Sequence, residues 1–126
     1  MTKLESQYQD LKKAFARLKE AVVLPSTTIN QDATIKRFEF TFELCWKLMN
    51  NIVRQNRIEV YGPKNSFRAA ARLGLIDDPQ SWFKFLEARN YTVHTYDDKT
   101  ALWVYNRAKE FVPYVKELIK KASEYL

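Results

Sequence analysis

The stretch IKRFEFTFELCWKLMNNI, residues 35–52, decides the fold class. Its apolar side chains recur at alternating steps of three and four residues, which places them on one face of an α-helix. The members of this stripe are Ile35, Phe38, Phe42, Cys45, Met49 and Ile52. The pattern predicts a long amphipathic helix that runs to about Asn56, with Asn30 or Asp32 as its N-cap.

A second apolar stripe lies upstream of the first and has the same spacing. Its members are Leu4, Tyr8, Leu11, Phe15, Leu18 and Val22. The pattern predicts another long helix, which ends before Pro25 and the Ser-Thr-Thr that follows it.

Two further helix starts are marked by proline. Gly62-Pro63 places proline at a first helical position, and Gly74 suits the left-handed end of the short helix that follows. Asp78-Pro79 is a second start of this kind, with a capping aspartate before the proline.

The last predicted helix starts near Asp98–Thr100 and contains Pro113, which should kink it or remove one backbone hydrogen bond. The chain therefore has four longer helices and one short one, joined by brief loops. This pattern predicts an all-α fold, an antiparallel four-helix up-and-down bundle with one extra short helix. We expect residues 1–126 to form one domain, since no linker or repeat interrupts them.

The composition narrows the class of protein. Two glycines argue against a turn-rich β fold, and one cysteine fits a reducing compartment. The first ten residues have no apolar signal core, and no apolar run is long enough to cross a membrane. We therefore expect a cytoplasmic protein without a membrane partner. The formal charge of +6 favours polyanionic partners.

The chemistry open to this chain is limited. One histidine and one cysteine exclude the usual His/Cys zinc sites, and no glycine-rich phosphate loop is present. We expect no metal or other cofactor. Cys45 lies on the apolar stripe, so it is more readily a buried thiol than a nucleophile. Glu39, Glu43 and Lys47 recur at steps of four residues and form either a solvated stripe or one wall of a site.

The segment RNYTVHTYDD, residues 89–98, contains the only histidine. Imidazole transfers protons near neutral pH, and guanidinium grips phosphate, so His94 and Arg89 together could cleave RNA without a metal. Five helical steps separate them by about 140° and about 7.5 Å along the axis. They do not share one face of an ideal helix. The run YTVHTY consists largely of residues that are poor helix formers. Either it distorts or ends the helix, or a second copy of the chain completes the site.

A structural alternative stays open for the same residues. His94 could be a surface histidine near a helix end, with Arg89 paired to Glu87 or Asp97. Tyr96 could simply cover the end of a helix.

Three segments match a known pattern: FEFTFELCWK (38–47), GPKNSFRAAARLGLI (62–76) and WFKFLEARNYTVHTY (82–96). Over about residues 4–125 the sequence resembles the HEPN superfamily, and within it the nucleotidyltransferase substrate-binding proteins. The family signature is Arg, a polar residue, three residues, His, any residue and Tyr. Here it reads Arg89, Asn90, His94 and Tyr96.

The resemblance implies a homodimeric helical toxin of a toxin–antitoxin pair that acts on RNA rather than DNA. Arg89 and His94 would be the metal-independent ribonuclease pair, and Asn90 would position them. A minimal nucleotidyltransferase, the antitoxin, would silence the toxin by transferring AMP from ATP to Tyr96.

Two rival hypotheses belong to other classes of protein. In the first, the chain is a non-catalytic subunit that presents a small substrate or nucleotide to its nucleotidyltransferase, with Arg89 holding a phosphate. In the second, the chain is a structural interaction module, and Arg89 and His94 tolerate alanine.

Overall fold

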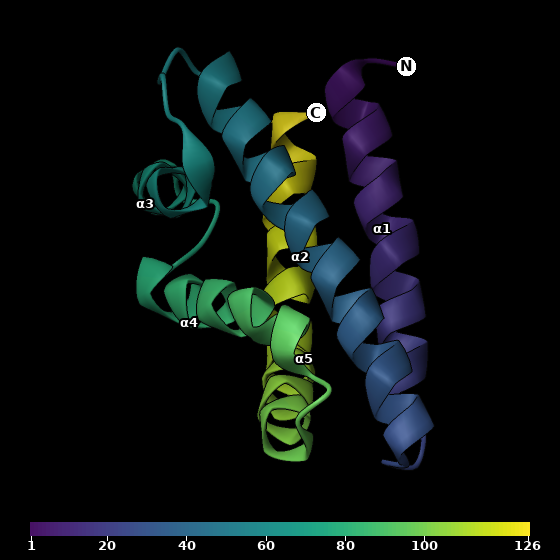
Figure 1. Ribbon diagram of the computed structural model, residues 1–126. Helices are drawn as coiled ribbons and strands as arrows, with labels where there is room; N and C mark the ends of the chain where they lie inside the picture. The colour runs from purple at the N-terminus through teal and green to yellow at the C-terminus, as the bar shows by residue number, and fades with distance from the viewer.

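The computed structural model describes residues 1–126, which form helices and no strands (Figure 1). The five α-helices are α1 (Lys3–Val22), α2 (Thr28–Gln55), α3 (Gly62–Leu73), α4 (Pro79–Asn90) and α5 (Asp98–Ala122). Two short 3-10 helices follow α4 and α5, namely η1 (Tyr91–His94) and η2 (Ser123–Tyr125). The predicted all-α bundle is confirmed.

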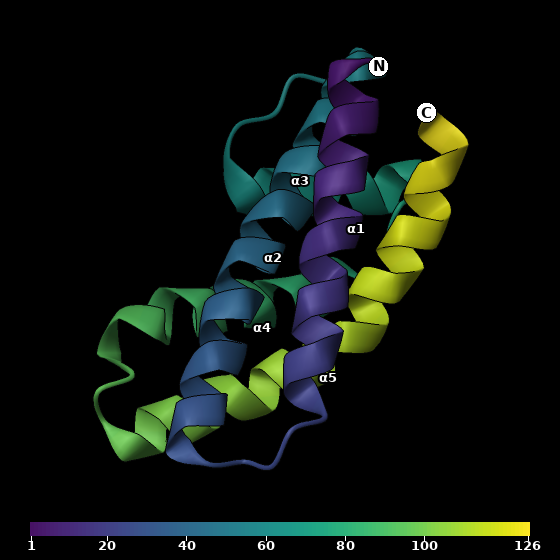
Figure 2. The same ribbon diagram turned by 90° about the vertical axis from the view of Figure 1, so that its right-hand side faces the viewer.

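The three long helices α1, α2 and α5 lie side by side, and α2 and α5 run antiparallel to α1 (Figures 1 and 2). The short helices α3 and α4 lie across them on one side. The prediction of four longer helices differs from the structure in one respect. Helix α4 has 12 residues, as α3 does, because the run YTVHTY ends it at Asn90.

Most of the predicted helix ends are confirmed. Gly74 has a φ of 88° at the end of α3, a left-handed conformation that glycine adopts without steric cost. The carboxylate of Asp78 accepts a hydrogen bond from the Gln80 N–H at the start of α4. The predicted cap of α2 is wrong. Thr27 caps this helix, because its hydroxyl accepts the N–H of Asn30 and the Asn30 side chain donates to the Pro25 carbonyl.

The hydrophobic core joins all five α-helices. Phe111 of α5 is fully buried, and its ring lies 5.1 Å from Phe38 of α2, 5.3 Å from Trp82 of α4 and 4.9 Å from Phe85 of α4. Aromatic rings bury much apolar area, and their edge-to-face contacts add specific attraction. This cluster fixes α4 across the long helices, and therefore fixes the place where α4 ends.

Helix α5 is continuous through Pro113 but bent, as Figure 2 shows between its green and yellow halves. Proline has no N–H, so one backbone carbonyl in the preceding turn has no partner within the helix. The predicted kink is therefore confirmed. The N-terminus and the C-terminus both lie at one end of the long helices, and η1 lies toward the other end (Figure 1).

None of the helices combines the length and apolar character that crossing a membrane requires.

Candidate functional site

The signature residues lie where α4 changes into η1. The Thr92 hydroxyl donates to the Arg89 carbonyl at 2.7 Å, and the Thr95 hydroxyl donates to the Thr92 carbonyl at 3.1 Å. These hydroxyls satisfy carbonyls that a continuing α-helix would have paired with backbone N–H groups. The predicted break is confirmed: Arg89 lies in the last turn of α4, and His94 is the last residue of η1.

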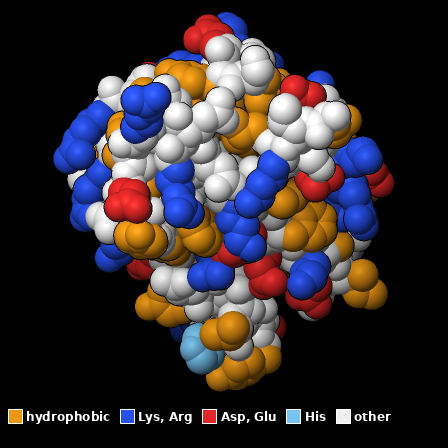
Figure 3. Space-filling model, turned by 90° about the horizontal axis from the view of Figure 1, so that it is seen from above, with side chains coloured by type: hydrophobic (Ala, Val, Ile, Leu, Met, Phe, Trp, Pro, Cys, Tyr) orange, Lys and Arg blue, Asp and Glu red, His pale blue; other side chains and the backbone are white.

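His94 and Tyr96 are both exposed and lie next to each other. Their ring centroids are 6.2 Å apart in an edge-on arrangement, and Tyr96 is 85% exposed. In Figure 3 the pale-blue imidazole protrudes at the lower edge of the molecule, among hydrophobic side chains. Both rings are therefore accessible to another macromolecule.

Arg89 is held by a residue that is distant in sequence. Its Nη2 atom lies 2.5 Å from Oε1 of Glu43, and Oε2 of Glu43 accepts the indole N–H of Trp46 at 3.1 Å. The guanidinium also donates weakly to Oδ1 of Asn90, at 3.4 Å. The expectation that Arg89 would pair with Glu87 or Asp97 is wrong, because packing of α4 on α2 brings Glu43 closer.

A cavity of about 300 Å³ lies beside this ion pair, between α2 and the end of α4. Its lining residues are Glu39, Glu43, Arg89, Asn90, Thr92 and Val93. The Arg89 side chain is 37% exposed, so the guanidinium stays accessible from solvent. An anion that enters here would meet the guanidinium fork and the Asn90 amide.

The predicted site residues fall into two groups within one copy of the chain. Glu43, Arg89 and Asn90 share the cavity, whereas His94 and Tyr96 lie on the protruding turn and do not line it. Lys47 is exposed on α2 and does not line the cavity either.

Two contributors were not predicted as site residues, Trp46 and Thr92, whereas Glu39 belongs to the predicted polar stripe of α2. Trp46 stands three residues after Glu43, a spacing that brings side chains together on a helix. That spacing was the available signal, although it does not show that Glu43 would face Arg89.

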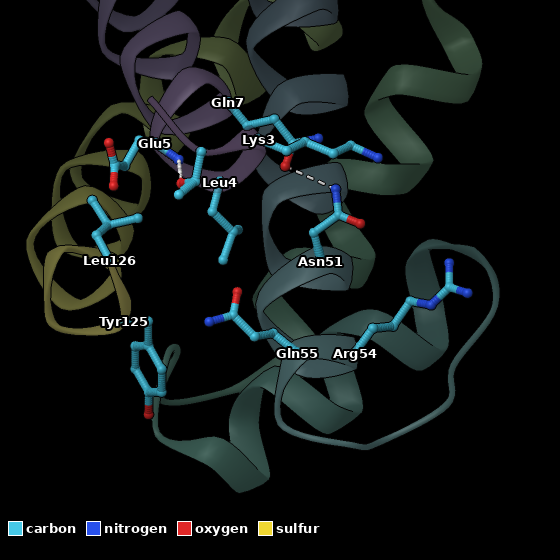
Figure 4. Close-up of a pocket in the computed structure, with 10 residues that line it drawn as sticks. Lys3, Leu4, Glu5, Gln7, Asn51, Arg54, Gln55, Tyr125 and Leu126 are labelled. Atoms are coloured by element: carbon cyan, nitrogen blue, oxygen red, sulfur yellow. Dashed lines mark hydrogen bonds between the residues drawn. The ribbon is translucent and has the colours of Figure 1, made fainter.

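A larger cavity, of about 480 Å³, lies at the end of the molecule that holds both chain termini (Figure 4). Residues of α1, α2 and η2 surround it, and a hydrogen bond of 2.8 Å joins Asn51 to Gln7 there. It contains no signature residue. No three His, Cys, Asp or Glu side chains lie close enough together to hold a metal ion.

Burial raises the pKa of the Cys45 thiol well above its usual value, as expected for a thiol with no accessible surface. The prediction of a buried thiol at this position is confirmed.

The sequence and the fold both match known proteins. Residues 6–124 match the family described as "nucleotidyltransferase substrate binding protein like". A Haemophilus influenzae protein named probable ribonuclease HepT is 34% identical, over 72% of this chain and 68% of that protein.

Two solved structures have the same fold. One, from Haemophilus influenzae, is described as revealing the fold of a substrate binding domain of a nucleotidyltransferase; it is 31% identical, with a TM-score of 0.84, covering 92% of this chain and 98% of that one. The other, a Thermus thermophilus protein, is 29% identical, with a TM-score of 0.83, covering 89% of this chain and 98% of that one.

Proposed function

The chain belongs to the nucleotidyltransferase substrate-binding family of the HEPN superfamily, and from this premise we propose that it is an RNA-cleaving toxin. The observation that carries the proposal is the complete signature at an exposed helix break: Arg89 and Asn90 beside a cavity, and His94 and Tyr96 on the turn that follows. The 34% identity to a protein named as a probable ribonuclease supports it.

The chemistry is an attack within the RNA itself. The ribose 2′-oxygen forms a bond to the adjacent phosphorus, the bond from phosphorus to the 5′-oxygen breaks, and a cyclic phosphate and a 5′-hydroxyl result. His94 takes the proton from the 2′-hydroxyl or gives one to the leaving oxygen. Arg89 stabilises the charge on the five-coordinate phosphorus, Asn90 positions the phosphate, and Glu43 orients Arg89.

We infer that a second copy completes the site, since Arg89 and His94 face different surroundings within one copy. Four exposed apolar side chains lie within twelve residues around His94, namely Tyr91, Val93, Tyr96 and Leu102. An exposed apolar cluster of this kind favours association. A homodimer formed through this patch would bury Tyr91, Val93 and Leu102, keep Tyr96 at the rim of the interface, and bring two signatures together.

The proposed control is AMP transfer to Tyr96 by a partner nucleotidyltransferase. The phenol oxygen forms a bond to the α-phosphorus of ATP, pyrophosphate leaves, and the phenol proton passes to solvent. The exposure of Tyr96 leaves its hydroxyl accessible to such a partner. The added phosphate would place negative charge beside His94 and repel RNA.

Purified protein incubated with RNA in the presence of EDTA tests the nuclease. We expect cleavage by the wild type, and loss of about 100-fold or more in rate for His94→Ala, the usual contribution of a general acid or base. RNA with 2′-O-methyl groups is the control, because it lacks the attacking hydroxyl. Equal cleavage by wild type and His94→Ala would remove the catalytic proposal.

The second candidate function is a non-catalytic subunit that presents a substrate or nucleotide to its nucleotidyltransferase. The matched family and one of the two structural neighbours are described in these terms, which supports it. Nucleotide binding through Arg89, without RNA cleavage, would favour this candidate over the nuclease.

Intact mass after incubation with the partner nucleotidyltransferase and ATP tests the modification. We expect whole AMP units on the wild type and none on Tyr96→Phe. Tyr91→Phe is the matched control, since Tyr91 is the nearest other exposed tyrosine and should leave the modification unchanged. AMP on the Tyr96→Phe protein would assign the acceptor to another residue.

A further inference from the structure

Helix α3 is the one α-helix without an acidic residue. It has three exposed basic residues, Lys64, Arg68 and Arg72, at steps of four, so they lie within about 80° on one helix face. We call these three the α3 stripe. None of the ion pairs in the molecule includes them. The stripe is therefore a row of positive charge without carboxylate partners.

The opposite face of α3 is fixed to the bundle, which turns the stripe outward. Phe67 is fully buried, and Asn50 of α2 donates a hydrogen bond of 2.9 Å to the Ser66 hydroxyl. The carbonyl at the end of the helix, on Leu73, accepts the Tyr125 hydroxyl at 2.9 Å. In Figure 3, Lys and Arg side chains lie along the left side of the view, the side on which α3 lies in Figure 1, and others lie in the centre and along the right side.

Two members of the stripe share a cavity with one signature residue. Lys64 and Arg68 line a cavity of about 350 Å³ between α3 and α4 together with Asn90. Glu87 also lines it, so two cations stand against one carboxylate. Asn90 lines both this cavity and the one beside Arg89, so the two cavities are neighbours.

Aromatic side chains accompany the basic ones. The Arg68 guanidinium lies 5.1 Å from the ring centroid of Phe83, and both residues line the cavity. Tyr61, the residue before α3, is 68% exposed. Basic residues that track phosphates, next to aromatic rings on which bases stack, are typical of surfaces that bind single-stranded nucleic acid.

From these contacts we propose that the α3 stripe binds backbone phosphates of the RNA substrate and leads the strand past Asn90 to Arg89. The inference rests on the proposed RNA-cleaving function and adds the path that the strand takes. Neighbouring members of the stripe are about 6 Å apart along the helix, which allows each to meet a different phosphate.

Two variants with the same charge test the stripe. One carries Lys64→Gln, Arg68→Gln and Arg72→Gln, and the control carries Lys12→Gln, Lys13→Gln and Lys19→Gln on exposed positions of α1. Three substitutions lower the net charge by three in each, from +6 to +3. Glutamine is a good helix former, so both variants should keep their helical content, which circular dichroism checks.

The probe is a fluorescent single-stranded 2′-O-methyl RNA, which binds without being cleaved. Each phosphate contact contributes about 0.7 to the salt slope of binding to a single strand, so the α3 variant should lose about 2 from the slope of log affinity against log salt. The Lys64→Gln variant alone should lose about 0.7. The α1 variant should keep the wild-type slope.

The outcomes separate the stripe from the nuclease. In one outcome the wild type binds RNA, and the α3 variant loses salt slope as expected, while natural RNA stays uncleaved. That result would reject the proposed nuclease activity but support RNA binding by the α3 stripe. Equal slopes in the α3 and α1 variants, or no RNA binding by the wild type, would overturn the stripe. Unchanged RNA binding by the α3 variant, with loss of binding to the nucleotidyltransferase, would overturn it too and assign α3 to a protein partner.

Discussion

Glu43 and Arg89 show how one ion pair affects the chemistry of a site. The carboxylate holds the guanidinium in place, and it also occupies one side of the donor fork that a phosphate would use. A phosphate at Arg89 would therefore compete with the Glu43 carboxylate and the Asn90 side-chain oxygen for the guanidinium donors.

The Cys45 thiol should be unreactive in the folded protein. This thiol is fully buried with a raised pKa, and the thiolate is the form that reacts with disulfide reagents. We expect the native protein to react with Ellman's reagent at least about 1000-fold more slowly than the unfolded chain, since reaction needs opening of the core. A Lys47→Cys variant, exposed on the same helix, should react at once. Rapid reaction of the native wild type would contradict the burial.

At the scale of elements, the sequence predicted what depends on local patterns. The stripes of α1 and α2, the proline starts of α3 and α4, and the break in YTVHTY are all short-range features, and each is confirmed. The spacing of apolar residues and the capping residues are local features of the sequence, so both can be recognised without knowledge of the tertiary structure.

Contacts between elements could not be predicted in the same way. The pairing of Arg89 with Glu43 depends on how α4 crosses α2, which no short stretch of sequence encodes. The prediction of the residue that caps α2 was wrong for a more local reason. Asn30 and Thr27 are both good caps, and the choice between them depends on the loop, where Asn30 binds the Pro25 carbonyl.

The aspartate cap at the start of α5 should make the stability of the fold depend on pH. The Thr100 N–H and then the Thr100 hydroxyl donate to the Asp97 carboxylate, and these bonds lower the pKa of Asp97. A lowered pKa stabilises the folded state above about pH 4, the ordinary aspartate value, and the stabilisation is lost as the pH falls through the folded-state value.

Thermal melts of the wild type and Asp97→Asn at pH 7 and pH 3 measure this effect. Asparagine also caps a helix but does not titrate, so the wild type should lose more melting temperature than the variant on acidification. An identical loss in both proteins would show that the Asp97 cap is not coupled to pH.

At the scale of the molecule, positive charge and apolar surface occupy different places. The α3 stripe lies on one side of α4, and the patch of Tyr91, Val93, Tyr96 and Leu102 lies on the protruding turn and the start of α5. One molecule can therefore hold a polyanion on one surface and a second copy on the other.

A charge placed in this patch should weaken the proposed dimer. Val93→Asp would bury an unpaired charge at the interface, which costs about 3 kcal/mol or more and weakens the dimer by about 100-fold or more. Sedimentation over a range of concentrations measures the dissociation constant. Val23→Asp is the matched control, because Val23 is 80% exposed and lies outside the patch. Equal association of both variants would place the interface elsewhere.

The position of the chain termini has a practical consequence for biosensor work. Because both lie at the end of the long helices away from η1, an affinity tag at either one would anchor the protein with its signature turn facing the bulk solution. RNA or nucleotidyltransferase flowing over such a sensor chip would reach the turn without obstruction from the support.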